Sequence, residues 1–476
     1  MYADLHLIID GERLPARARP GEPVINPATG QALAELPHAT DADLDLALEA
    51  AAAGFQVWRR MTPLERSLIL RRGAQLIRDR IEAIAVVMTL EQGKPLAESR
   101  GELNHGADVI DWYAEEGKRA YGRVVPGRNP GVRQLVVSEP VGVALAFTPW
   151  DFPALTPCRK IGGALAAGCS LVLKAAEETP GTAVAIVDAL HDAGLPPGVL
   201  NLVFGDPARV SGRLIASPLS AKVSFTGSVP IGRLLARQAA DGLKRATLEL
   251  GGHSPVVVFD DADVEAAADM LAGGKFRNAG QVCISPTRFY VQDAVFDRFA
   301  ERFAAAARAL KVGDGTAPDT QMGPLANARR VEAMERFVAD ARDRGGVIRT
   351  GGQRIGNEGY FFEPTVITDL PDDCLLMTEE PFGPVAPVVR FSELDEVTAR
   401  ANSLPFGLAA YAFARSNATV MAVGEGLKAG MVGINTLAIS TPETPFGGVR
   451  DSGQGQEGGV EGLQAYLDVK LIAQAP

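Results

Sequence analysis

The stretch that decides the fold is Val141-Gly142-Val143-Ala144-Leu145-Ala146-Phe147-Thr148-Pro149. It is a short apolar run that ends at Thr148-Pro149, and such a run is typical of a buried parallel strand. A helical segment over 161–168 follows it, and a second buried strand comes at 170–174. Strand, helix and strand repeat through residues 199–204 and 222–225. This alternation predicts a parallel sheet covered by helices.

The alternation resumes after Gly251, where Pro255-Val256-Val257-Val258-Phe259 has the pattern of another buried strand. We therefore expect a second unit and assign the fold class as α/β with two parallel sheets. Upstream, residues 41–88 carry apolar side chains at helical spacing and predict helices. Neither a low-complexity linker nor a repeat of solenoid or propeller period is visible.

The composition is that of an ordinary globular protein. The 476 residues are 46% apolar and 22% charged, and the length suggests about three domains. The formal net charge of −11 and the pI near 5.2 argue against nucleic acid as a partner, because phosphates need a basic surface.

The amino terminus has no basic segment followed by an apolar one, and no apolar run approaches the ~20 residues that span a bilayer. We therefore expect a cytoplasmic protein without a membrane partner. The cysteines are scattered, which indicates reduced thiols, and the histidines show no zinc-ligand spacing, so no metal is expected. The cysteines are Cys158, Cys169, Cys283 and Cys374.

Two short motifs carry groups that suit carbonyl chemistry. Cys283 ends the run Phe276-Arg277-Asn278-Ala279-Gly280-Gln281-Val282-Cys283, and Glu249 lies upstream in Leu248-Glu249-Leu250-Gly251-Gly252. A thiol that attacks a carbonyl and a carboxylate that activates water are the groups needed to oxidise an aldehyde to an acid. Most cysteines are only buried small hydrophobes, but glycine lets the backbone approach a ligand closely.

Two segments are candidate nucleotide sites. Gly453-Gln454-Gly455-Gln456-Glu457-Gly458 matches G-x-G-x-x-G, but no hydrophobic strand precedes it, so we interpret it as a chance match. Gly227-Ser228-Val229-Pro230-Ile231-Gly232 follows a strand and opens a helix, whose free N–H groups favour a phosphate. The alternative is a capped helix with a tight helix–sheet contact.

From 26–30 to 445–449 these motifs resemble the aldehyde dehydrogenase superfamily, closest to succinic semialdehyde and 2-oxoglutaric semialdehyde dehydrogenases. The resemblance implies a Rossmann-like NAD-binding domain, a catalytic domain and a small β oligomerisation arm, in a homodimer or homotetramer. The domains would span 1–119 with 141–250, then 251–440, and 120–140 with 441–476. Composition alone predicts a loop at 133–138, within the implied arm.

The resemblance also implies NAD as the cofactor, with NADP less favoured. Its expected contacts are Thr148, Pro149, Trp150, Lys174, Glu177, Gly227, Ser228, Gly232, Glu380 and Phe382. The Glu177 carboxylate can accept from a ribose 2′-hydroxyl and would repel a 2′-phosphate. The alternative for Lys174 and Glu177 is a solvated ion pair just past a strand.

In the implied mechanism Cys283 attacks the aldehyde and its own backbone N–H helps hold the oxyanion. Hydride leaves to nicotinamide, and Glu249 activates the water that hydrolyses the thioester. Lys160 and Glu457 match positions that pass the proton onward. A chain that transfers the thioester to coenzyme A is a rival, which Glu249 disfavours.

One residue departs from the family pattern Pro-Trp-Asn-Phe-Pro, because this chain has Pro149-Trp150-Asp151-Phe152-Pro153. An ionised Asp151 has no proton to donate to the oxyanion, whereas a protonated one could donate if burial raised its pKa. Catalysis is therefore impaired, or Asp151 is kept protonated, or the chain carries an altered residue. A non-catalytic NAD-binding homologue is a further alternative.

Arginines suggest the substrate class. Arg159 and Arg277 match positions at which semialdehyde dehydrogenases hold the distal carboxylate, and Arg pairs bidentately with carboxylates. The run from Ser440 and Thr441 to Pro445 is similar to the substrate loop of the same enzymes. The alternative is that both arginines are surface or structural ion-pair residues.

Overall fold

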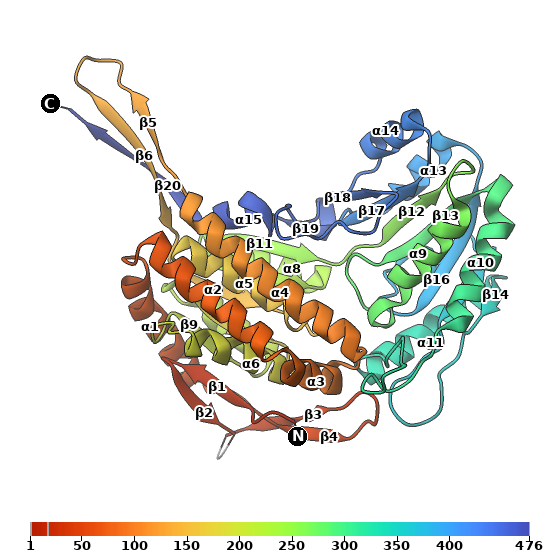
Figure 1. Ribbon diagram of the computed structural model, residues 1–476, viewed down its shortest axis with the longest axis horizontal. Helices are drawn as coiled ribbons and strands as arrows, with labels where there is room; N and C mark the ends of the chain where they lie inside the picture. The colour runs from red at the N-terminus through yellow and green to blue at the C-terminus, as the bar shows by residue number, and fades with distance from the viewer. Residues whose placement is uncertain (1, 17–18, 476) are drawn as a thin grey trace.

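The computed structural model describes residues 2–16 and 19–475, and within these ranges eight strands form the first sheet (Figure 1). Their order is β19-β11-β10-β7-β8-β9-β1-β2, and the strands from β11 to β9 run parallel. In that order they span Gly453–Gln454, Arg245–Leu250, Ser220–Gly227, Val143–Phe147, Ser170–Lys174, Leu200–Val203, His6–Ile9 and Glu12–Pro15. Every residue of β7, β8 and β9 is buried, which confirms the predicted buried strands.

Helices cover both faces of this sheet. They are α1 (Asp41–Trp58), α2 (Pro63–Asp79), α3 (Ile81–Gln92), α4 (Leu96–Glu116), α5 (Leu155–Ala167), α6 (Pro180–Asp192), α7 (Pro207–Ala216), α8 (Val229–Asp241) and α15 (Gly459–Gln464), with the turn η1 (Gly117–Arg119) after α4. The predicted helical segment 41–88 is thus three helices. Thr40 and Thr62 cap α1 and α2 through capping boxes, because each hydroxyl and the acid three residues on satisfy free backbone N–H groups.

The second sheet confirms the second α/β unit. Its order is β14-β15-β16-β13-β12-β17-β18, and only the β14 pairing is antiparallel among the described pairings. The strands span Val347–Thr350, Thr365–Thr368, Val385–Phe391, Pro286–Gln292, Ser254–Val258, Ala409–Phe413 and Met431–Ile434 in that order. Its helices are α9 (Val264–Phe276), α10 (Phe296–Ala309), α11 (Ala328–Asp343), α12 (Leu375–Thr378), α13 (Leu394–Ala401) and α14 (Asn417–Gly426), with the turns η2 (Arg277–Gly280), η3 (Asp293–Val295) and η4 (Arg450–Ser452).

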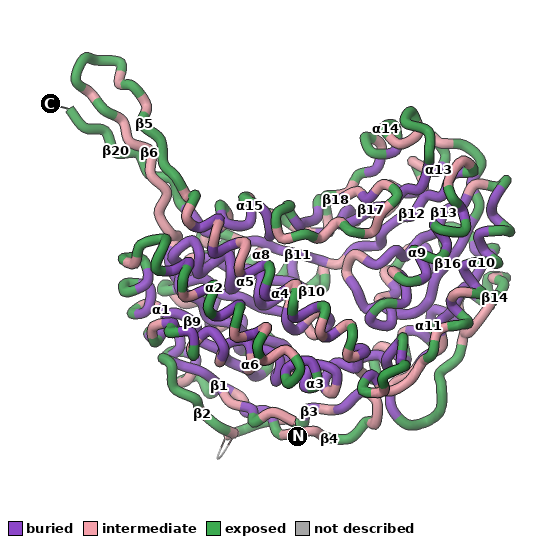
Figure 2. The backbone as a smooth tube through the Cα atoms, viewed as in Figure 1, coloured by how far each residue is buried: buried purple, intermediate pink, exposed green. Residues whose placement is uncertain are grey.

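A narrow antiparallel sheet protrudes from the body as an arm (Figure 1), and much of it is exposed (Figure 2). It consists of β5 (Arg123–Pro126), β6 (Arg133–Pro140) and β20 (Leu467–Gln474). The loop predicted from composition at 133–138 is wrong, because β6 pairs along its whole length with β20, from Pro140 opposite Leu467 to Arg133 opposite Gln474. A partner so distant in sequence leaves no local signal.

Two features of the ends bear on the site. A hairpin of β3 (Gly21–Ile25) and β4 (Ala32–Pro37) lies near the start of the chain. Near the other end, β19 pairs with β11 and α15 packs on α5, so the segment between Thr441 and β20 folds back onto the first sheet.

Two hydrophobic cores underlie the two sheets, one for each. Among the described residues, none of the helices is long and apolar enough to cross a membrane. The cysteines are unpaired, and no group of metal-binding side chains is found in this part of the chain.

Candidate functional site

Cys283 follows a tight left-handed turn between the end of α9 and the start of β13. Asn278, Ala279 and Gly280 have φ of 50°, 52° and 73°. At Gly280 a Cβ atom would lie 2.2 Å from the Gly383 carbonyl oxygen, so only glycine fits there. The turn places Cys283 at the junction of two cavities, where its side chain is half-buried.

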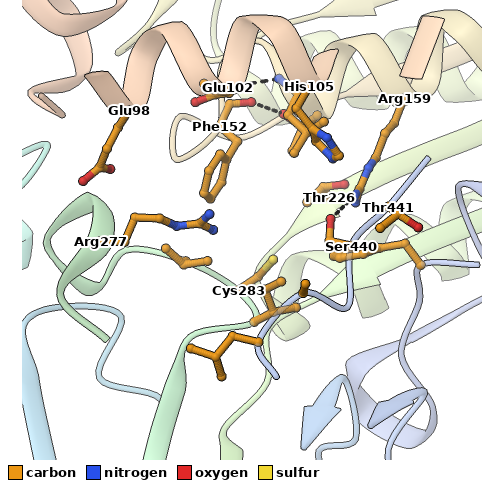
Figure 3. Close-up of a pocket in the computed structure, with 18 of the residues that line it drawn as sticks. Glu98, Glu102, His105, Phe152, Arg159, Thr226, Arg277, Cys283, Ser440 and Thr441 are labelled. Atoms are coloured by element: carbon orange, nitrogen blue, oxygen red, sulfur yellow. Dashed lines mark hydrogen bonds between the residues drawn. The ribbon is translucent and has the colours of Figure 1, made fainter. Parts of the chain in front are cut away.

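The first cavity has a volume of about 440 Å³ and lies between α4, α5 and the loop before β19 (Figure 3). The second has about 260 Å³ and extends from Cys283 toward the start of α8. Cys283 and Thr226 line both cavities. The nucleophile predicted from the sequence is therefore accessible from two differently lined spaces.

Glu249 lies near the end of β11 and lines the second cavity. It is buried, and neither carboxylate oxygen has a hydrogen-bond partner among the described residues. Burial, and secondarily the nearby Glu457, raises the pKa of Glu249 well above its ordinary value. A carboxylate held in this way suits a general base that works near neutral pH.

Lys160 and Glu457 come together as a buried ion pair. The Lys160 Nζ lies 2.5 Å from Glu457 Oε1 and 3.2 Å from Ser224 Oγ. Glu457 belongs to the segment that matched G-x-G-x-x-G, and that segment begins as the edge strand β19 beside Glu249. The match therefore lies at a sheet edge rather than between a strand and a helix, as we interpreted it.

Asp151 follows β7 and lines the second cavity together with Cys283. Its Oδ1 is buried and has no hydrogen-bond partner among the described residues. Burial raises the pKa of Asp151 to about 6, although the Lys94 ammonium acts in the opposite direction. Burial, followed by the charge of Asp151, also raises the pKa of the Cys283 thiol.

Most of the expected cofactor residues line the second cavity, and the others lie outside its lining. Pro149, Trp150, Gly227, Ser228, Glu380 and Phe382 line the second cavity. The rings of Trp150 and Phe382 meet edge to face at 5.5 Å. Burial raises the pKa of Glu380 to about 8. Gly232 lies instead under the sheet, where a Cβ would come within 2.3 Å of the Leu250 side chain, so its part is the tight helix–sheet contact.

Lys174 is the last residue of β8, and Glu177 follows in the loop after it. Their side chains form an ion pair at 2.6 Å and are 7% and 15% exposed, so the pair is largely buried rather than solvated. Burial raises the pKa of Glu177, and Lys174 lowers it. The backbone N–H of Thr148 donates to the Lys174 carbonyl at 3.2 Å.

These residues fit a dinucleotide. Ser228 occupies the N-cap position of α8 without a side-chain capping hydrogen bond, and backbone N–H groups at a helix start favour a phosphate. The buried hydroxyls of Thr148 and Thr226 have no partner among the described residues, so they are free to bind a ligand. The second cavity then leads from the helix start to Cys283.

Arg159 and Arg277 both line the first cavity, with Ser440 and Thr441 (Figure 3). Arg159 is buried on α5, its guanidinium lies 3.8 Å from the centre of the Phe446 ring, and it donates to Ser440 Oγ at 2.6 Å. Arg277 is exposed, 5.4 Å from the Phe152 ring. Neither arginine has an ion-pair partner within the described ranges, although the exposed Arg277 still fits a surface residue.

Sequence reasoning missed several residues of the site. His105, Glu98, Glu102 and Lys94 line the first cavity, from α4 or just before it, and Arg330 lines the second. Burial, and secondarily Arg159, lowers the pKa of His105. No motif marks α4, and its place beside Cys283 follows only from packing.

Comparison with known proteins agrees with this geometry. The sequence profile described as "Aldehyde dehydrogenase family" matches residues 16–472. The 4-(hydroxymethyl)benzenesulfonate dehydrogenase TsaD1 of Comamonas testosteroni is 49% identical over 99% of this chain and 98% of its own. Succinate-semialdehyde dehydrogenase (NADP+) GabD of Escherichia coli is 45% identical over 98% and 96%. A solved structure titled "Crystal structure of E. coli NADP dependent enzyme" covers 100% of this chain and 98% of its own, with TM-score 0.98 and 44% identity.

Cys283 and the buried Glu249 line one cavity that fits a dinucleotide, as expected of an oxidoreductase, and the chain belongs to the aldehyde dehydrogenase family. It is an NAD(P)-dependent aldehyde dehydrogenase, which oxidises an aldehyde to the acid.

Proposed function

We propose that this enzyme oxidises a semialdehyde, an aldehyde that carries a carboxylate at its far end, through a covalent bond to Cys283. The observation that supports the proposal is the first cavity, in which Arg159 and Arg277 lie on the same space as Cys283. A carboxylate bound by the arginines would present its aldehyde carbon to the sulfur.

In the proposed chemistry Glu249 takes the thiol proton, directly or through water, because the thiolate is the nucleophile. The sulfur bonds to the aldehyde carbon and the carbonyl oxygen becomes an oxyanion. The Cys283 backbone N–H and a protonated Asp151 would stabilise it. The carboxyl of Asp151, with its raised pKa, can carry the necessary proton.

When bound, NAD(P) accepts the hydride that leaves the same carbon. The residues that would hold it are those of the second cavity, with Ser228 at the phosphates and Glu380 and Phe382 beside the reacting end. Once Glu249 has passed on the thiol proton, water attacks the remaining thioester and gives a proton to Glu249. The bond between carbon and sulfur then breaks, which releases the acid and restores the Cys283 thiolate. The buried Lys160–Glu457 pair lies close enough to act on the Glu249 pKa, which supports its role in passing the proton onward.

The test is a set of aldehydes of equal length. Succinic semialdehyde is compared with butanal, for the native enzyme, Arg159→Met and Arg277→Gln. Because a charge-assisted hydrogen bond contributes about 1.5–3 kcal/mol, each variant should raise the KM for the carboxylate substrate ~10-fold or more. The KM for butanal should stay within about twofold. Equal losses on both aldehydes would contradict the proposal.

A second candidate is an aromatic aldehyde with a sulfonate, such as 4-formylbenzenesulfonate. Apart from its arginines, the first cavity presents Phe152, Leu155 and Phe446, which can pack against a ring. A relative that is 49% identical bears the name of a 4-(hydroxymethyl)benzenesulfonate dehydrogenase. A higher kcat/KM for this aldehyde than for succinic semialdehyde would replace the first candidate.

We propose NAD as the preferred cofactor, because the Glu177 carboxylate would accept from a ribose 2′-hydroxyl. The Lys174 ammonium already pairs with that carboxylate and reduces its repulsion of a 2′-phosphate. The preference for NAD over NADP should therefore be moderate.

The domain assignment is likewise a proposal, with the cofactor domain at 1–119 and 141–250 and the catalytic domain at 251–440. The arm would join subunits into a homodimer or homotetramer. Val124, Val469 and Leu471 on the arm are 70%, 73% and 61% exposed, and such an apolar surface is typical of an interface.

A further inference from the structure

A buried ion pair lies directly behind Asp151. Lys94 precedes α4, Glu102 is on its second turn, and their side chains are 1% and 2% exposed. The Lys94 Nζ lies 2.5 Å from Glu102 Oε2. Taking two charges out of water costs several kcal/mol per ion, and a pair of this kind is held only where further hydrogen bonds satisfy it.

The further partners all belong to the loop that carries Asp151. Lys94 Nζ donates to the Asp151 carbonyl oxygen at 2.8 Å and lies 4.3 Å from the centre of the Phe152 ring. Glu102 Oε1 accepts from the backbone N–H groups of Ala154 at 2.7 Å and Leu155 at 3.1 Å. Beyond their mutual contact, the hydrogen bonds of the pair go to this segment, although both residues line the first cavity.

The same carbonyl also receives a donor from the nucleophile loop. Asn278 Nδ2 donates to the Asp151 carbonyl oxygen at 3.0 Å and to the Gln281 carbonyl at 2.8 Å. The Asn278 backbone N–H donates to Glu98 Oε2 at 2.9 Å, so α4 also contacts this loop directly. The Asp151 carbonyl thus links the loop that bears Asp151 to the loop that bears Cys283. Figure 3 shows Glu98 and Glu102 on α4, near Phe152 and Arg277 of these two loops.

We propose that Lys94 and Glu102 are positioning residues, which hold the Asp151 loop against the Cys283 loop and so fix the oxyanion side of the site. The inference rests on the proposed role of Asp151 at the oxyanion. The distance between a donor and a developing charge controls the rate strongly, since a 1 Å misplacement can cost ~10²-fold.

The main test is the double variant Lys94→Met/Glu102→Gln in the full-length enzyme. It removes both charges together, so no unpaired charge is left buried, and it keeps both side chains at nearly their native length. The matched control is Arg100→Met/Glu82→Gln, which removes an exposed pair, 2.8 Å apart, between α4 and α3. We expect the first variant to lower kcat by ~10–10²-fold and to leave the KM for the dinucleotide within about twofold. The control should match the native enzyme.

Hydrogen exchange supplies a readout that does not depend on turnover. In the first variant the amides of Ala154 and Leu155 should exchange at least ~10-fold faster than in the control. Native kcat together with native exchange would overturn the proposal. A separate outcome concerns Asp151→Asn. If this variant leaves kcat unchanged at every pH, while amide exchange still accelerates in Lys94→Met/Glu102→Gln, the oxyanion role of Asp151 is wrong but the positioning of its loop by Lys94 and Glu102 is retained.

Should the double variant not fold, Lys94→Gln/Glu102→Gln also removes both charges, keeps an acceptor for the two amides and keeps an amide donor near the Asp151 carbonyl. It should accelerate their exchange by a few-fold and lower kcat in proportion. Unchanged exchange and unchanged kcat in this variant would overturn the proposal as well.

Discussion

At the scale of the residue, Asp151 is where the sequence departs from its family and where the structure gives a physical account. An ionised carboxylate would oppose both the thiolate and the oxyanion, whereas a protonated one can donate. Burial raises its pKa to about 6, which makes the protonated form available in mildly acidic solution. The same burial makes the protonation of Asp151 sensitive to pH near 6.

Asp151→Asn should therefore raise kcat, and the gain should grow with pH. The native enzyme should lose kcat as pH rises through about 6, because the donor is deprotonated there. The Asn variant keeps its donor, so at pH 8 its kcat should be higher by up to ~10²–10³-fold. Initial rates from pH 5 to 9 check this. A variant slower than native at every pH would show that the carboxyl has another role.

Stability provides a control for the same residue. In the unfolded chain Asp151 titrates near its ordinary pKa of 3.8, and in the folded protein near 6, so the folded state binds the proton more tightly. Its contribution is fully present below about pH 4 and is lost as pH rises through 6. Thermal unfolding should show Asp151→Asn more stable than native by up to about 3 kcal/mol at pH 8, with the difference vanishing near pH 4.

At the scale of the element, the sequence predicts what is local. The strands β7 to β9 could be predicted because each is a short, mostly apolar run, and the Cys283 turn because its glycine lies in a short motif. Strand β6 could not, since its pairing partner lies at the other end of the chain. The sequence did not identify helix α4 as part of the site either, because its Glu98 and Glu102 contact residues that are distant in the sequence.

The ion pair of Lys174 and Glu177 at the end of β8 is the basis of the predicted preference for NAD over NADP. Glu177→Gln removes the charge that would repel a 2′-phosphate and leaves Lys174 free to attract it. The ratio of kcat/KM for NAD to that for NADP should fall by ~10-fold or more, mainly through a lower KM for NADP. Initial rates with both cofactors measure it. An unchanged ratio would mean that the pair lies outside the ribose site. Gln75→Glu, on the outer face of α2, serves as a surface-charge control.

At the scale of the whole molecule, the arm projects apolar side chains into solvent, and we expect it to bind another subunit. Val469→Asp/Leu471→Asp places two charges on its exposed face and should convert the oligomer to monomers, seen by light scattering after size-exclusion chromatography. Gln474→Asp at the end of the same strand is the control and should leave the mass unchanged. A native enzyme that is already monomeric would refute this role of the arm.

The meeting of two cavities at Cys283 gives the reaction centre two faces. The dinucleotide would occupy the face toward α8, and the acid-bearing tail the face toward α4 and α5. Neither ligand has to pass the other to leave. An acyl group can therefore stay on sulfur while the spent dinucleotide departs, and the vacated face becomes a route for water beside Glu249. Departure of the dinucleotide before water enters would permit one site to carry out a dehydrogenation and then a hydrolysis, with the acyl carbon shielded from water in the first reaction and open to it in the second.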